Sequence, residues 1–266
     1  MNRTLVRCER RGPVATVTMD NPRTMNAMDT ELGPQLAGAL EGLALDPAVA
    51  AVVLTGAGGN FTGGGNLKKA GEHLEQHPGQ GAGPVFAAYL QYVLRVVQAL
   101  TGMPQPVVCA VEGAASGAGL AWMLASDLVL CADDARILPG FLGVGLVPAA
   151  GVTLHLPRLV GLARASEMLM LGRPIDLARA QALGLVHRVT PPGQALAQAQ
   201  ALAQELAAGS RPALAATKRL LGRAARQGLA TQLEAERRAV MAAADHEEFA
   251  KRLRRFLSRG ADKKEG

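Results

Sequence analysis

The sequence predicts an α/β protein in which a core of repeated strand–strand–helix units is followed by a region of helices. Short runs of Val, Ala and Leu alternate with longer segments whose apolar residues recur at helical spacing. Two of the apolar runs end at glycine-rich turns that lead into helices, and the strand pattern fades after about residue 160. We therefore expect a core over residues 1–200 and a C-terminal helical region over residues 201–266.

Four segments are expected to form strands. VATVTMD (14–20) alternates apolar and polar residues, whereas VAAVVLTG (49–56) and PVVCAVEG (106–113) are continuous apolar runs. LVLCADDARI (128–137) follows the next helical segment. Continuous apolar runs of this length suit strands that are covered on both faces.

Helices are expected between and after these strands. MDTELGPQLAGALEGLA (28–44) and FAAYLQYVLRVVQALTG (86–102) carry apolar residues at helical spacing, whereas the glycine-rich segment 58–84 is expected to be a loop. Beyond residue 160, the segments ARASEMLMLG, DLARAQALG, QALAQAQALAQELAAG and ALAATKRLLGRAAR predict four helices. One long final helix is expected from about residue 230 to residue 257.

The composition of the chain narrows the classes of protein to which it can belong. No apolar run approaches the roughly 20 residues that span a bilayer, and MNRTLVRCERRGPVATV lacks the apolar segment of a secretory signal, so we expect no membrane partner. Three cysteines without metal-like spacing favour a reducing cytoplasm, with Cys109 and Cys131 buried in strands. The net charge of +6 is concentrated in KRLRRFLSRGADKKEG, but few aromatic residues are present, which disfavours a nucleic-acid partner.

Two stretches share the order strand, glycine-rich turn, helix: VVLTGAGGNFTGGGNLKKA and VVCAVEGAASGAGLAWML. Free backbone N–H groups at such turns bind anions, and two converging turns would form an oxyanion hole. Neither stretch contains a P-loop motif. Phe61 and Trp122 stand where a dinucleotide-binding fingerprint would need its third glycine, and no nucleophile elbow fits around Ser116.

Five segments occur in an order and spacing that together are highly specific: DNPRTMNAMD, AVVLTGAGGNFTGGGNLK, PQPVVCAVEGAASGAG, LGVGLVPAAGVTLHLPRLVGLARASEML and GRPIDLARAQALGLVHRV. Through them the chain resembles the crotonase superfamily, the enoyl-CoA hydratase/isomerase family, from about residue 4 to residue 258. The run from Val107 to Gly119 and the LPRLVG segment look most like the branch that isomerises epoxides and double bonds of phenylacetyl-CoA derivatives.

The resemblance implies the crotonase-like fold of ββα units with a C-terminal helical trimerisation region, assembled as a homotrimer or a dimer of trimers. It implies an acyl-CoA thioester as ligand, with coenzyme A as part of the substrate, no separate cofactor and no metal. The thioester oxygen would lie between the backbone N–H groups of Gly65 and Gly117. The residues that would lie along the CoA moiety are Thr24, Asn26, Asn66, Leu67 and Lys68.

The chain departs from the hydratase pattern at the positions of the acid/base groups. Ala121 and Phe141 stand where the resemblance places the two hydratase glutamates, and Ala149 stands where isomerases often carry a carboxylate. We therefore expect isomerase, decarboxylase or other lyase chemistry, in which backbone N–H groups stabilise a thioester enolate. Ala121, Trp122 and Phe141 would then shape an apolar acyl pocket.

Three alternatives remain at this point. The first alternative is an ordinary hydratase with unusual acid/base groups, and the second is a non-catalytic acyl-CoA-binding or assembly protein. The third is a serine peptidase of the related caseinolytic fold, with Ser116 as its nucleophile. The peptidase needs a histidine where Phe141 and Leu142 stand. We expect structural roles for Glu112 and His187, and solvent-exposed positions for His73 and His77.

Overall fold

The computed structural model describes residues 3–224 and 227–262. The strands are β1 (Val6–Arg11), β2 (Val14–Met19), β3 (Ala51–Gly56), β4 (Val107–Val111), β5 (Ala114–Ser116), β6 (Leu128–Ala132), β7 (Arg136–Leu138) and β8 (Arg188–Thr190). The helices of the core are α1 (Leu32–Leu45), α2 (Leu67–Gln76), α3 (Gly83–Gly102), α4 (Ala118–Ala125), α5 (Val152–Val160), α6 (Leu162–Leu171), α7 (Leu177–Ala182) and α8 (Ala195–Ala207). They are followed by α9 (Arg211–Ala224), α10 (Leu229–Ala244) and α11 (Glu247–Asp262).

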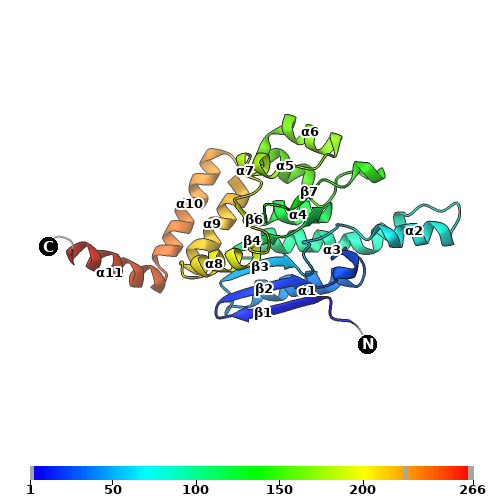
Figure 1. Ribbon diagram of the computed structural model, residues 1–266. Coiled ribbons are helices and arrows are strands. Elements are labelled where there is room, and N and C mark those ends of the chain that lie inside the picture. The colour runs from blue at the N-terminus through cyan, green and yellow to red at the C-terminus, as the bar shows by residue number, and fades with distance from the viewer. Residues whose placement is uncertain (1–2, 225–226, 263–266) are drawn as a thin grey trace.

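A six-stranded sheet in the order β1-β2-β3-β4-β6-β8 forms the centre of the fold (Figure 1). β1 and β2 are antiparallel, and each later neighbour is parallel. β5 and β7 form a separate two-stranded parallel sheet. The expected α/β fold is confirmed. Three predicted strand segments contain β2, β3 and β4, whereas the segment 128–137 forms two strands, β6 and β7, in different sheets.

Apolar residues cover both faces of the large sheet, as its continuous Val/Ala/Leu runs require. Helices α1, α3 and α4 pack on one face and contribute to the larger core. On the other face α8 presents Ala195, Ala199 and Ala203, each fully buried against the strands. Small residues at this helical spacing let the α8 backbone approach the sheet closely. Cys109 and Cys131 are buried free cysteines within the strands, as expected.

Several elements differ from the sequence prediction, among them β5, β7 and α5, which were not predicted as separate elements. The segment expected to be a loop contains α2, because LKKAGEHLEQ is built mainly of good helix formers although glycines flank it. The expected final helix is two helices, α10 and α11, with a break at Asp245 and His246. The short strands β1 and β8 gave no apolar signal, since β1 reads VRCERR and is mostly exposed.

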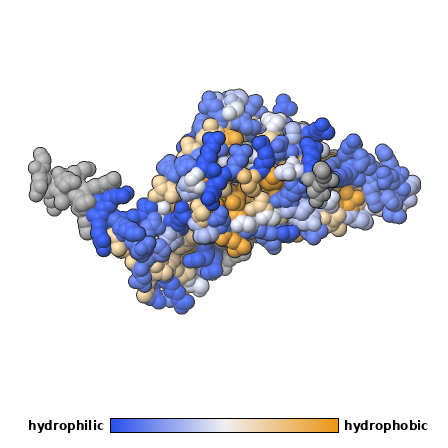
Figure 2. All heavy atoms as spheres, turned by 90° about the horizontal axis from the view of Figure 1, so that it is seen from below, coloured by the Kyte–Doolittle hydropathy of each residue, from blue (hydrophilic) through white to orange (hydrophobic). Residues whose placement is uncertain are grey.

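Residue 200, where the sequence predicts the division between core and helical region, lies inside α8, whose buried face packs on the sheet. Beyond α8 the chain continues with α9, and α10 and α11 lead away from the sheet on the side opposite to α2 (Figure 1). The face shown in Figure 2 is largely hydrophilic at the α2 end, and apolar residues gather towards its middle. No helix within the described ranges is both long enough and apolar enough to cross a bilayer.

Lys218 connects α9 to the core through a nearly buried charge. Its Nζ lies 2.7 Å from the Asp127 carboxylate and donates to the carbonyl oxygens of Leu100 (2.8 Å) and Gln105 (3.0 Å). The same carboxylate accepts a 2.7 Å hydrogen bond from the Val107 amide at the start of β4. Burial lowers the pKa of Lys218 even though Asp127 acts in the opposite direction.

We predict that Lys218→Met lowers the free energy of unfolding by about 2 kcal/mol, less than for a fully buried pair because Asp127 is partly exposed. The substitution leaves the Asp127 carboxylate without its counter-charge. Urea denaturation measures the change, with Glu167→Gln, which removes the exposed Arg179–Glu167 pair, as the matched control. Equal stability of Lys218→Met and the control would contradict this role.

Candidate active site

The two glycine-rich turns lie against each other through backbone hydrogen bonds. The Thr62 amide donates to the Ala114 carbonyl (2.8 Å), and the Ser116 amide donates to the Thr62 carbonyl (3.0 Å). Gly64 has φ +96°, and a Cβ there would lie 2.8 Å from the Ser116 carbonyl oxygen. Only glycine permits this approach, so the FTGGGN segment is fixed beside β5.

Neighbouring bonds orient the Gly65 amide. The Met28 amide donates to the Gly64 carbonyl (2.7 Å), and the Asn66 amide donates to the Met28 carbonyl (2.9 Å). The buried Thr62 hydroxyl donates to the Asn26 carbonyl (2.8 Å) and accepts from the Gly64 amide (3.1 Å). Within the described ranges the N–H of Gly65 has no hydrogen-bond partner, and Gly65 lines a cavity.

The second N–H group that faces the cavity belongs to Ala118 and not to Gly117. The Gly117 amide donates to the Leu138 carbonyl (3.2 Å), so it continues the pairing between β5 and β7. Gly117 then turns the chain into α4 with φ +52° and ψ −103°. The next residue, Ala118, begins α4 and lines the cavity, and its N–H has no partner in the described part of the chain. The unpaired N–H group at this turn therefore lies one residue beyond the one expected from the sequence.

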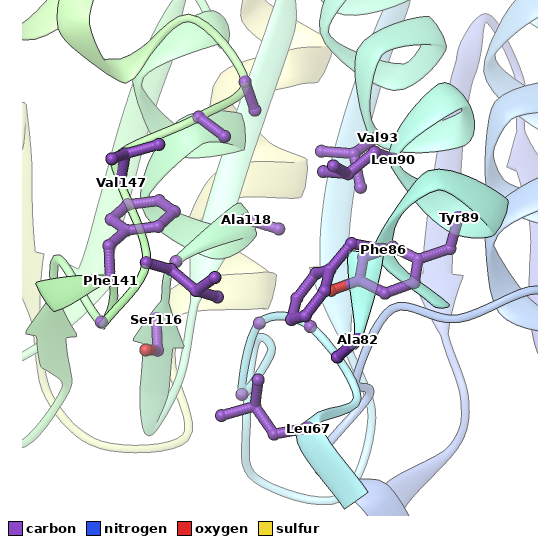
Figure 3. Close-up of a pocket in the computed structure, with 18 of the residues that line it drawn as sticks. Leu67, Ala82, Phe86, Tyr89, Leu90, Val93, Ser116, Ala118, Phe141 and Val147 are labelled. Atoms are coloured by element: carbon purple, nitrogen blue, oxygen red, sulfur yellow. The ribbon is translucent and has the colours of Figure 1, made fainter. Parts of the chain in front are cut away.

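The cavity between these turns has a volume of about 480 Å³. Side chains of α3 form one wall, and the segment from Gly140 to Ala150 forms the opposite wall (Figure 3). Its lining residues are Gly63, Gly64, Gly65, Leu67, Ala82, Gly83, Phe86, Tyr89, Leu90, Val93, Ser116, Gly117, Ala118, Gly140, Phe141, Leu146, Val147, Ala149 and Ala150.

The lining is almost wholly apolar. Among the described residues it contains no carboxylate, imidazole, ammonium or guanidinium group, and only Tyr89 and Ser116 carry a side-chain hydroxyl. In Figure 3 the Tyr89 hydroxyl lies beside Phe86, while the Ser116 side chain is directed away from that wall. No histidine of the described ranges lines the cavity with Ser116, which argues against the peptidase alternative.

The three residues expected in the acyl pocket do not lie together. Phe141 lines the cavity opposite Phe86 (Figure 3). Ala121 and Trp122 are fully buried in the core and do not line it. Trp122 packs edge-on against Phe61, with ring centroids 6.4 Å apart. The reason is that α4 presents Ala118 to the cavity, whereas one turn later its side chains pack into the core.

The turn expected along CoA is anchored by Asn26, whose side chain is fully buried. The Asn26 amide donates to the carbonyls of Ala57 (2.9 Å) and Asn60 (2.8 Å), and its oxygen accepts from the Asn21 amide (2.8 Å). This side chain is therefore occupied inside the protein and is not available to contact a ligand. Thr24 is partly exposed, and its hydroxyl donates to the Asn21 carbonyl (3.2 Å).

A polar cluster lies behind the first turn. The Asn66 amide group donates to Asp29 (3.1 Å), and Lys69 lies 3.1 Å from Asp29 and 3.2 Å from Glu31. Burial alone would raise the pKa of the Asp29 carboxyl, but hydrogen bonds from the Leu32 and Glu31 amides and from both neighbouring side chains lower it below its ordinary value. The charge of Lys69 is thus already engaged by two carboxylates.

Leu67 and Lys68 begin α2. Leu67 lines the cavity, whereas the Lys68 side chain is 86 % exposed and lies 3.8 Å from Glu72. Lys68 is therefore a solvent-exposed, loosely paired cation next to the cavity-lining Leu67.

Three other groups have structural contacts. Glu112 accepts from the amides of Gly193 (3.0 Å) and Ala195 (2.8 Å), so it fixes the start of α8 as a structural residue. His187 Nδ1 accepts from the Val129 amide (3.0 Å), and burial lowers its pKa. His73 is half-buried and its ring stacks on that of the exposed His77 with 4.5 Å between centroids.

The side chains of α3 that line the cavity were not predicted from the sequence. Phe86, Tyr89, Leu90 and Val93 follow the spacing of one helical face and all line the cavity. The helix itself was predicted, but an apolar face is equally typical of a core helix. The signal that distinguishes it is the hydroxyl of Tyr89 within this face.

Comparisons with known proteins agree with this architecture. The profile of the family described as "Enoyl-CoA hydratase/isomerase" matches residues 9–264. The chain belongs to the enoyl-CoA hydratase/isomerase family. It is similar to the 1,2-epoxyphenylacetyl-CoA isomerase of Escherichia coli, at 32 % identity over 84 % of each chain.

Other relatives in this family carry other activities in their names. The chain is 31 % identical to 4-chlorobenzoyl coenzyme A dehalogenase-2 of an Arthrobacter species, over 92 % of this chain and 88 % of that protein. The crystal structure of an enoyl-CoA hydratase from Polaromonas sp. JS666 aligns with a TM-score of 0.89 and 33 % identity, over 96 % and 97 % of the two chains. The similarity therefore establishes the fold and the family but not the reaction.

We predict that Gly117→Ala abolishes ligand binding while it costs only about 1–3 kcal/mol in stability. A Cβ at this position meets no atom closer than 3.9 Å, so the effect comes from the left-handed backbone, which sets the direction of the Ala118 N–H. Isothermal titration calorimetry with phenylacetyl-CoA measures binding, and thermal unfolding measures stability.

The matched control is Gly38→Ala on the exposed surface of α1, where a Cβ has no neighbour within 4 Å. Because alanine favours a helix over glycine, this control should gain up to about 1 kcal/mol and bind normally. Unchanged binding by Gly117→Ala would contradict the role of this turn.

Proposed function

We propose that this protein binds an acyl-CoA thioester and stabilises its enolate between the backbone N–H groups of Gly65 and Ala118. Both N–H groups lack partners in the described part of the chain, and both residues line the same cavity. The Ala118 N–H lies at the N-terminus of α4, where the helix dipole favours negative charge. Removing one donor from such a hole in other enzymes costs about 10²–10³ in rate.

The chemistry of the lining supports a lyase of the decarboxylase type. Hydration and allylic isomerisation need a positioned acid or base, and no carboxylate or imidazole of the described chain lines the cavity. Loss of CO₂ needs no such base, because the breaking C–C bond leaves its electron pair on the α-carbon. That pair delocalises onto the thioester oxygen, where the two N–H groups bind it. The absence of a carboxylate or imidazole among the described residues that line the cavity is the observation that carries this proposal.

The cavity also supports a bulky, apolar acyl group. Phe86 and Phe141 stand on opposite walls (Figure 3), and a volume of about 480 Å³ accommodates an aromatic or alicyclic ring. CoA would extend past Leu67, with Lys68 and the Thr24 turn near its phosphates, as a part of the substrate and not as a separate cofactor. Because the E. coli relative is named for a phenylacetyl-CoA derivative, isomerisation of an aryl substrate is the second candidate.

We also propose that the chain assembles as a homotrimer or a dimer of trimers through its C-terminal helices. Large apolar side chains are strongly exposed on α9 and α10, including Leu221 (71 %), Leu229 (74 %) and Val240 (67 %). Large apolar residues exposed close together on neighbouring helices are typical of a surface through which protein chains associate.

The decisive experiment is turnover of a panel of CoA thioesters followed by mass spectrometry. We predict CO₂ release from a 2-substituted malonyl-CoA, and hydration of crotonyl-CoA at least about 100-fold slower than by a relative that has acid/base carboxylates. Calorimetry with phenylacetyl-CoA, which has no carboxylate to lose, measures binding alone.

The other outcomes select the alternatives. Efficient hydration of crotonyl-CoA would contradict the proposal and indicate a hydratase with other acid/base groups. Binding of phenylacetyl-CoA without turnover of any thioester in the panel would indicate a non-catalytic acyl-CoA-binding protein.

A further inference from the structure

Tyr89 combines a buried position with an unpaired hydroxyl. The residue is 5 % exposed on α3, and its ring packs against Phe86 with 5.7 Å between centroids. Within residues 3–224 and 227–262 its hydroxyl has no hydrogen-bond partner, and burial alone acts on its ionisation. Since buried tyrosine hydroxyls usually find a partner, an unpaired one in a cavity is suited to a ligand.

The hydroxyl lies directly beside the first N–H donor. A Cβ on Gly65 would overlap the Tyr89 oxygen, so the phenol occupies the space next to this amide. Figure 3 shows the ring reaching from α3 towards the cavity with its oxygen beside Phe86. An enolate whose oxygen is bound by the Gly65 N–H would therefore share this part of the cavity with the hydroxyl.

Tyr89 also separates the apolar cavity from a second, polar one. That second cavity has a volume of about 360 Å³ and is lined by Tyr89 together with Asp29, Thr30, Asn66, Lys69, Glu72, His73, Gln76, Val85 and Ala88. A proton lost from the phenol on the apolar side can be replaced from water on this polar side.

We propose that Tyr89 is the proton donor of the reaction, and this assignment rests on the proposed function. After CO₂ leaves, the enolate carbon takes the phenolic proton: a C–H bond forms, the O–H bond of Tyr89 breaks, and the thioester C=O bond is restored. The phenolate left behind is reprotonated by water from the polar cavity. No oxidant, reductant or metal is required for this step.

The ionisation of the phenol agrees with this role. Burial raises the pKa of Tyr89 from 10.0 to about 12, so the hydroxyl stays protonated throughout the neutral range. A thioester enolate is a far stronger base than a phenolate, so the proton transfer is downhill. Ser116, the other hydroxyl in the lining, is directed away from this wall (Figure 3).

The sequence provides a matched control, because Tyr89 and Tyr92 are its only two tyrosines. Tyr92 lies on the same helix but packs towards Gly33 and outside the cavity lining. Tyr89→Phe and Tyr92→Phe each remove one hydroxyl and leave the ring, so both variants should fold.

The first measurement is the stereochemistry of methylmalonyl-CoA decarboxylation in D₂O. We expect one configuration at the α-carbon of deuterated propionyl-CoA from the wild type and from Tyr92→Phe. From Tyr89→Phe we expect both configurations in about equal amounts and a kcat lower by about 100-fold, because water then delivers the deuteron. Unchanged stereochemistry and rate in Tyr89→Phe would overturn the assignment alone, whereas no CO₂ release by the wild type from this or any other 2-substituted malonyl-CoA would contradict the proposed function.

The second measurement does not depend on turnover. Protein labelled with ¹³C at the tyrosine Cζ gives two NMR signals, which the two variants assign. Binding of phenylacetyl-CoA should shift the Tyr89 signal and leave the Tyr92 signal in place. A Tyr89 signal that does not move when phenylacetyl-CoA binds would overturn the assignment, whether or not the wild type decarboxylates the first probe.

Discussion

The pairing of Thr62 with β5 is the interaction on which the site depends. It joins two turns that are far apart in sequence, and the fully buried Thr62 hydroxyl also binds the Asn26 carbonyl and the Gly64 amide. A Cβ at Gly119 would lie 2.7 Å from the Thr62 methyl group, so the α4 backbone must also stay free of side chains here. The glycines thus serve a close packing of backbones, and the unpaired N–H groups at its rim follow from that packing.

The N–H groups of Gly65 and Ala118 carry partial positive charges at the rim of an apolar cavity, where they interact strongly with a negative charge. Interactions between charges increase as the local dielectric falls, and donors that are fixed before the substrate binds need no reorganisation. The same apolar lining disfavours a buried carboxylate, which favours its loss as CO₂. A neutral phenol such as Tyr89 is the kind of proton donor that this cavity tolerates, because it carries no charge until the moment of reaction.

Sequence patterns predicted the main strands of the sheet and the large helices, because these depend on apolar periodicity. They also placed Gly65 in a glycine-rich turn, and this turn lines the cavity. They did not predict β5 or its pairing with β7, which engages the Gly117 N–H with the Leu138 carbonyl and leaves the Ala118 N–H as the unpaired group. Trp122 could not be assigned to the core from sequence, since helix phase relative to a cavity depends on tertiary packing. Asn26 was expected beside the ligand, yet its side-chain amide is buried and donates hydrogen bonds to the Ala57 and Asn60 carbonyls.

The central claim is that the thioester oxygen accepts hydrogen bonds from two backbone N–H groups. Infrared difference spectroscopy of phenylacetyl-CoA labelled with ¹³C at its thioester carbonyl tests this claim directly, because hydrogen bonds to the oxygen weaken the C=O bond. The account predicts that the carbonyl stretch of the bound ligand moves to lower wavenumber than in water. A stretch at or above its value in water would contradict it.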